Sequence, residues 1–208
     1  MNNLNKIPIH DSSLRHSTGQ AIYIDDMPEQ ENLLHGAPVL SKVACGKIKK
    51  INSDKLKDLP FFTKIITAKD IPGENEIGPI KNGEPILADD FFSYLGQPVA
   101  IVLAKTHQEA IYASSLVEIE LEFTTKPILN LDDAYEQKSF LEDPMILEKG
   151  NIKKDMSKSN YTLSGDFEIG GQDHFYLETH VAITFPGEND EYVISVSYTH
   201  LRAHETDY

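Results

Sequence analysis

The sequence has 208 residues, a formal net charge of -14 and 40% apolar residues. This length is sufficient for one large or two modest domains with ordinary hydrophobic cores. The strong negative charge argues against nucleic acid or an anionic membrane as a partner, because both are bound by basic surfaces.

The cysteine content points to a reducing compartment, and the short apolar runs argue against a membrane span. The single cysteine, Cys45, cannot form an internal disulfide bond, and it is best explained as a small buried hydrophobic side chain. The longest apolar run covers residues 98–104, whereas a membrane-spanning helix needs about 20 residues. The N-terminal residues MNNLNKIPIH lack the apolar core of a signal peptide. We therefore expect a cytoplasmic protein without a membrane span.

Strand patterns dominate the first part of the chain, after a polar leader at residues 1–16. Alternating apolar residues predict strands at 19–25, 34–41, 46–51 and 61–68. Ser53 is a candidate N-cap for a short helix at 54–59, which Pro60 would end. Three prolines and three glycines in residues 70–85 predict a long loop. A loop of this length in a compact domain is more often functional or an insertion than an ordinary connection.

A strand, a helix and a second strand follow in order. Residues 97–104 are nearly all apolar, which is typical of a strand covered on both faces. Thr106 and Glu109 have the spacing of a capping box and predict a helix. The sequence VEIELEF at 117–123 alternates strictly, so its glutamates should form a solvated face. This order predicts a βαβ-like unit. The residues expected to face inward are Val117, Ile119, Leu121 and Phe123.

The last third of the chain indicates a second domain. A short helix is expected at 132–137, and the loop-rich residues 139–160 are typical of a domain boundary. Strand patterns then follow at 161–169, 174–185 and 191–195, with turn residues between them. Consecutive strands of this kind predict an antiparallel sheet.

The densest group of polar side chains is GDFEIGGQDHFYLETH at residues 165–180. In a strand, alternate side chains from His174 to His180 would share one face. Gly170 and Gly171 lie directly upstream, where a bulge, a bend or the close approach of a ligand needs a residue without Cβ. A zinc site from His174, Glu178 and His180 is disfavoured, because same-face neighbours in a strand are ~7 Å apart.

Several stretches together resemble the molybdopterin-binding subunits of bacterial xanthine dehydrogenases, in the xanthine oxidase and aldehyde oxidase family. In order and spacing they cover nearly the whole chain. They are HDSSLRHSTGQAIYIDDMP (10–28), VLS (39–41), AKDIPGEN (68–75), EPILADDFFSYLGQPVAIVLA (84–104), SFLED (139–143) and GDFEIGGQDHFYLETH (165–180). The chain begins directly at this segment, which looks like the arrangement with the iron–sulfur and flavin parts on a separate polypeptide.

The resemblance implies an α+β fold. Residues 17–127 would form the family's α/β hammerhead domain, residues 128–144 a linker, and residues 145–195 the start of the first molybdenum-cofactor-binding domain. The glycine-rich loop and the catalytic glutamate of the family have no counterpart in this sequence, which indicates a truncated, N-terminal fragment. The last residues, VSYTHLRAHETDY, do not resemble the family, and we expect 196–208 to be a non-native tail.

The resemblance also implies hydroxylation of hypoxanthine or xanthine to urate, with water as the oxygen source. Electrons would pass from a molybdenum–molybdopterin cofactor through 2Fe-2S clusters and FAD on a partner subunit to NAD, so the full-length protein would be hetero-oligomeric. The expected cofactor-binding residues are Gly170, Gly171, Gln172, His174 and Glu178. No catalytic residue is assigned, and no metal site from side chains is expected. His200, His204 and Glu205 have the spacing of ligands on a helix, but a third histidine or cysteine ligand is absent.

Other interpretations stay open. Gln172, His174 and Glu178 could instead satisfy buried backbone groups and fix the sheet. The substrate could be that of an aldehyde oxidase or of a carbon monoxide dehydrogenase-type large subunit. A non-catalytic α/β interaction module is the alternative from a different functional class.

Overall fold

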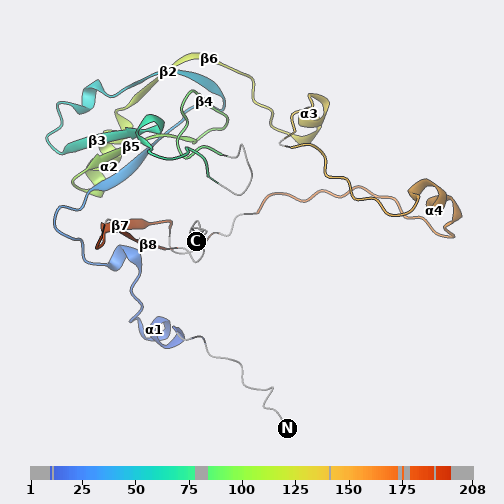
Figure 1. Ribbon diagram of the computed structural model, residues 1–208, viewed down its shortest axis with the longest axis horizontal. Coiled ribbons are helices and arrows are strands. Elements are labelled where there is room, and N and C mark those ends of the chain that lie inside the picture. Colours follow the sequence, from blue (N-terminus) through green and yellow to red (C-terminus); the bar gives the residue numbers. More distant parts are fainter. Residues whose placement is uncertain are drawn as a thin grey trace, which may run out of the picture. The chain divides into compact units, whose positions relative to one another are not determined.

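The computed structural model describes residues 10, 12–77, 84–140, 142–172, 175, 179–189 and 191–197 (Figure 1). The chain divides into two compact units, which are described separately. One unit is Gln30–Gly150, and the other combines Met1–Glu29 with Asn151–Tyr208. Among the described helices, none is long and apolar enough to cross a membrane.

Two antiparallel sheets form the unit Gln30–Gly150 in the described part of the chain (Figure 1). The first has the strand order β1-β5-β3 and the second has the order β4-β2-β6. The strands of the first sheet are β1 (His35–Leu40), β5 (Pro98–Ala104) and β3 (Phe62–Thr67). Those of the second sheet are β4 (Phe91–Phe92), β2 (Gly46–Asn52) and β6 (Glu118–Thr124).

The central strand β5 is covered on both faces, as its apolar sequence predicts. Helix α2 (His107–Ser115) packs Ala110 and Ala113 into the core clusters that contain β5 residues. The helix begins where expected, because Thr106 Oγ1 accepts a hydrogen bond from the Glu109 backbone N–H. Glu109 reaches back to the Thr106 hydroxyl, at 2.9 Å, in a variant of the expected capping box. The buried residues of β5 are Val99, Ala100, Val102 and Ala104.

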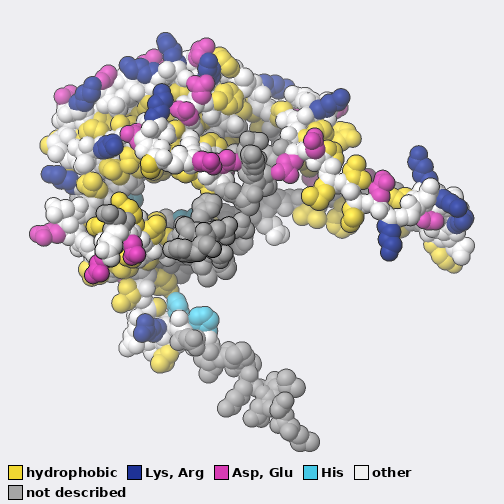
Figure 2. All heavy atoms as spheres, viewed as in Figure 1, with side chains coloured by type: hydrophobic (Ala, Val, Ile, Leu, Met, Phe, Trp, Pro, Cys, Tyr) yellow, Lys and Arg dark blue, Asp and Glu magenta, His cyan; other side chains and the backbone are white. Residues whose placement is uncertain are grey.

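The solvated glutamate face of β6 is confirmed, and each glutamate faces a lysine. The Nζ–carboxylate distances are 3.0 Å for Lys47–Glu122, 3.9 Å for Lys49–Glu120 and 2.5 Å for Lys55–Glu118. Figure 2 shows acidic and basic side chains interspersed over this unit. Exposed pairs of this kind contribute little to stability, because water screens the two charges.

Two expectations for this part of the chain are wrong. Strands β5 and β6 belong to different sheets, and β6 pairs antiparallel with β2, so α2 connects the two sheets and no βαβ unit forms. Phe123 was expected to face inward, yet it is 47% exposed. The β2–β6 register shifts beside it, between Lys47 and Ile48, which interrupts the alternation of buried side chains.

Short helical elements replace some of the predicted strands and loops. Residues 19–25 form no strand, because the Asp26 carboxylate accepts a bond from the Tyr23 N–H and stabilises a turn. The helix expected at 54–59 is only a 3₁₀ turn, and the helix expected near 132–137 is confirmed. The remaining helical elements are α1 (Ser13–Thr18), η1 (Ile24–Asp26), η2 (Asp54–Leu56), η3 (Ala68–Asp70), α3 (Leu131–Glu136) and α4 (Ile152–Lys158).

Helix α4 lies within residues that were expected to form a loop. Asn151 caps it by accepting a bond from the Lys154 N–H, a contact that composition alone did not suggest. The later strands β7 (Ala182–Pro186) and β8 (Tyr192–Val196) form an antiparallel hairpin, in agreement with the expected sheet. The strand expected at 161–169 is absent, since these described residues have no strand partner.

Candidate functional site

Three of the residues predicted to meet a cofactor are described, and they lie in an irregular, exposed segment. Gly170, Gly171 and Gln172 are exposed and belong to no helix or strand. His174 and Glu178 lie outside the described residues, so their predicted shared face is untested. Phe175 has φ +46° and is 92% exposed, and this backbone conformation contradicts a continuous strand from residue 174.

The glycine pair leaves its backbone open. A Cβ built on Gly170 or on Gly171 would meet no atom within 4 Å. The packing of this chain therefore does not require glycine at these positions, and a bulky group has room to approach the backbone. Gly170, Gly171 and Gln172 nevertheless line neither of the two hollows described below. By themselves they form no cradle for a cofactor, and no chemical step is assigned to them.

No set of three or more metal-ligating side chains gathers in the part of the chain that the structure describes. The His200, His204 and Glu205 motif and the expected tail from residue 198 onward lie outside it.

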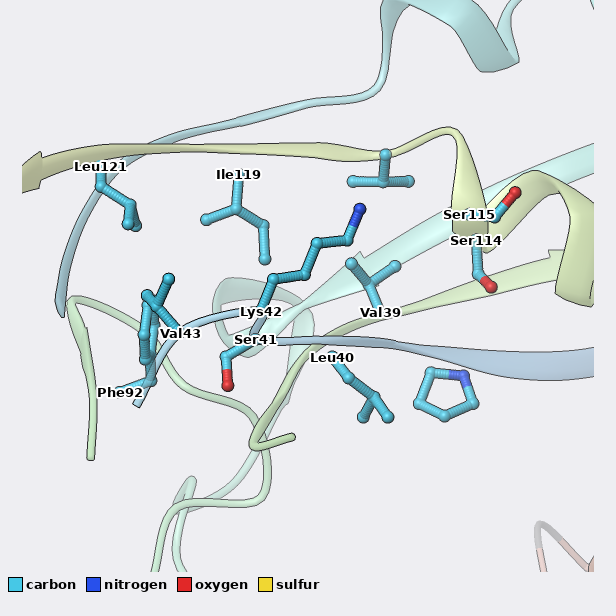
Figure 3. A pocket seen from close by; sticks show the side chains of 12 residues that line it. Val39, Leu40, Ser41, Lys42, Val43, Phe92, Ser114, Ser115, Ile119 and Leu121 are labelled. Atoms are coloured by element: carbon cyan, nitrogen blue, oxygen red, sulfur yellow. The ribbon is translucent and has the colours of Figure 1, made fainter. Parts of the chain in front are cut away.

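A cavity of about 400 Å³ opens in the unit Gln30–Gly150 instead, between the two sheets (Figure 3). The end of β1, the last residues of α2 and one face of β6 line it. Its walls are mainly apolar, and Lys42 is the only charged residue among those that line it. The apolar lining residues are Pro38, Val39, Leu40, Val43, Phe92, Val117, Ile119 and Leu121. The sequence did not reveal this cavity, because these residues come from separate segments with no shared motif.

A second hollow, of about 420 Å³, lies beside β2 and η3. It is lined by both signs of charge, including Lys49, Lys50 and Lys69 with Asp89 and Asp90. Neither hollow contains a residue that the sequence singled out for cofactor binding.

Comparison with known families identifies the two parts of the chain. Residues 18–125 match the family model described as aldehyde oxidase and xanthine dehydrogenase, a/b hammerhead domain. Residues 135–208 match the model described as molybdopterin cofactor-binding domain. The fold is thus an α/β hammerhead domain followed by the start of a molybdopterin cofactor-binding domain, which confirms the predicted α+β class. This chain belongs to the aldehyde oxidase and xanthine dehydrogenase family.

Individual relatives span several activities. The chain is 37% identical to the xanthine dehydrogenase/oxidase of Gallus gallus over 93% of its own length, and the match spans 14% of that protein. The aldehyde oxidoreductase of Desulfovibrio gigas superposes with a TM-score of 0.74 at 26% identity, covering 88% of this chain and 22% of that one. The CO dehydrogenase of Oligotropha carboxidovorans superposes with a TM-score of 0.51 at 30% identity, covering 61% of this chain and 16% of that one.

Proposed function

We propose that this chain contributes to a molybdenum hydroxylase that oxidises hypoxanthine and xanthine to urate. The observation that supports this proposal is the 37% identity to a xanthine dehydrogenase/oxidase over 93% of the chain. The complete enzyme would take its oxygen atom from water. Its electrons would leave through 2Fe-2S clusters and FAD on a partner subunit to NAD. Because the chain spans 14% of the length of this relative, activity requires the rest of the enzyme.

The molybdopterin cofactor, when bound, supplies the redox chemistry, and the protein supplies orientation and electrostatics. We propose that residues 170–178 form one edge of its site, with Gly170, Gly171, Gln172, His174 and Glu178 toward the cofactor. The open backbone at the two glycines supports this assignment, since a planar group could approach there without meeting a side chain.

An enzyme containing this segment and its partner subunit is expected to form urate from xanthine with reduction of NAD. The 208-residue chain alone should form no urate and retain no molybdenum, because most of the catalytic protein lies outside it. Urate absorbance and metal analysis by mass spectrometry provide the two measurements. Benzaldehyde and carbon monoxide serve as competing substrates. Faster oxidation of either one than of xanthine would replace the proposal with the aldehyde oxidase or carbon monoxide dehydrogenase alternative.

Gly171→Val in the complete enzyme should lower the molybdenum content per flavin several-fold, because a branched side chain would occupy space proposed for the cofactor. The matched control is Gly165→Val, since a Cβ at Gly165 also meets no atom within 4 Å of this chain. The two substitutions should therefore have the same effect on folding. Equal molybdenum content in both variants would contradict the placement of the cofactor beside Gly171.

The aldehyde oxidase alternative rests on the structural similarity to the aldehyde oxidoreductase of Desulfovibrio gigas. That similarity concerns the fold and the family. Both would be the same in an enzyme that oxidises xanthine and in one that oxidises an aldehyde. A purely non-catalytic module is less well supported, because a molybdopterin cofactor-binding model matches residues 135–208.

A further inference from the structure

We propose that the cavity between β1, α2 and β6 binds a small amphipathic monocarboxylate, with its apolar body between the two sheets and its carboxylate at Lys42. The inference concerns only the unit Gln30–Gly150, called the hammerhead unit below. It does not depend on the substrate of the molybdenum centre.

The size and walls of the cavity suit a small organic ligand. Its volume of about 400 Å³ lies within the range of about 300–1,000 Å³ that is usual for small-molecule sites. Val39 and Phe92 are buried in its wall, so the cavity is continuous with the hydrophobic core. Leu40 and Val43 remain exposed where it opens to solvent. A ligand with an apolar body would cover this surface and remove it from water.

The charge at the opening selects an anionic head group. Figure 3 shows the Lys42 side chain extending among the apolar side chains of the cavity, near Val39 and Ile119. No ion pair holds Lys42 in the described residues. The charge of Lys42 acts on the Glu118 carboxylate, which forms an ion pair with Lys55 Nζ at 2.5 Å. The hydrogen bond from Lys55 chiefly lowers the pKa of Glu118, and Lys42 adds a smaller effect in the same direction. Glu118 thus already has Lys55 as its partner, so Lys42 remains available to the carboxylate of a ligand.

The remaining polar groups favour a single negative charge. Ser114 donates its hydroxyl to the Ile111 carbonyl, and Ser115 donates to the Tyr112 carbonyl. The Ser41 hydroxyl likewise donates to the Tyr94 carbonyl. These three serines have no hydroxyl proton left to donate to a ligand. A sugar or a phosphate, which needs several donors, would be poorly satisfied, but a monocarboxylate needs one strong donor and apolar walls.

Sodium octanoate titrated into the ¹⁵N-labelled 208-residue chain provides the test, with 1-octanol as the uncharged counterpart. Octanoate should shift the amide signals of residues that line the cavity in a saturable way, with a dissociation constant of about 1 mM or lower. Lys42→Met should weaken octanoate binding by up to about fivefold and leave octanol binding unchanged, as expected for one exposed charge pair. Val43→Asp should weaken the binding of both ligands.

The matched control is Lys50→Met, which removes a lysine from the wall of the other hollow and should change neither affinity. Lys42, Val43 and Lys50 are exposed, so the three variants should keep the wild-type signal dispersion. Equal affinities for octanoate and octanol would overturn the role of Lys42. Shifts that do not saturate, or that miss the lining residues, would overturn the site itself.

Discussion

Phe92→Ala is expected to lower the free energy of unfolding of the hammerhead unit by about 4 kcal/mol, the usual cost of removing a fully buried ring. Phe92 is 1% exposed and packs with Ile48, Ala88 and Val99 in one core cluster. The ring also lies close to the backbone of β2, since a Cβ built on Gly46 would stand 3.1 Å from its Cζ. The ring fills the space beside this glycine, so its removal should leave a cavity.

Urea denaturation of the chain, followed by far-UV circular dichroism, measures this loss. The matched control is Phe123→Ala, which removes the same ring from an exposed position on β6. The control should cost clearly less than Phe92→Ala, because Phe123 is already 47% exposed and has less buried apolar surface to lose. Similar losses in the two variants would mean that Phe92 does not belong to the core.

The elements that could be predicted from the sequence are those with a local cause. Strand β5 is apolar throughout, and Thr106 supplies its own helix cap, so both followed from a few neighbouring residues. The glutamate alternation in β6 fixed which side chains face water. It could not show that their partners are Lys47, Lys49 and Lys55, because those lysines lie far away in the sequence.

Two of the wrong predictions concern a partner distant in the chain. Residues 161–169 have an alternating apolar pattern, yet a strand forms only where another edge supplies hydrogen bonds, and the described chain supplies none. Likewise, α2 and its flanking strands resembled a βαβ unit, but β6 pairs with β2 in a different sheet. Periodicity indicates which residues can form a strand, but it does not indicate which other strand will pair with them.

The candidate sites likewise differ in whether their residues are contiguous in the sequence or are brought together only by the fold. The family, the fold and the molybdopterin-binding part were accessible because their motifs are contiguous in the sequence. The glycine pair at 170–171 was also found, but its environment in this chain is open, and its cofactor contacts remain a proposal. The apolar cavity near Lys42 was missed, because only the packing of β1, α2 and β6 brings its walls together.

Gln97→Met is expected to destabilise the hammerhead unit by about 2 kcal/mol, although the two side chains have nearly the same length and shape. Gln97 is 2% exposed, and its Oε1 accepts a 2.7 Å hydrogen bond from the Ser93 N–H. Its backbone joins the same network, because the Gln97 N–H donates to the Ser41 hydroxyl and the Ser41 N–H donates to the Gln97 carbonyl. Methionine fills the space and leaves the Ser93 N–H without this acceptor.

The network connects the end of β1 to the turn before β5, so the loss should appear in the cooperative unfolding of the whole unit. Gln108→Met provides the matched control, because Gln108 is exposed on α2 and water replaces any bond that it loses. The midpoint in urea should fall for Gln97→Met and change little for Gln108→Met, with the same dependence of free energy on urea concentration. A wild-type midpoint for Gln97→Met would mean that water satisfies the Ser93 N–H, and that this buried amide contributes packing and no essential hydrogen bond.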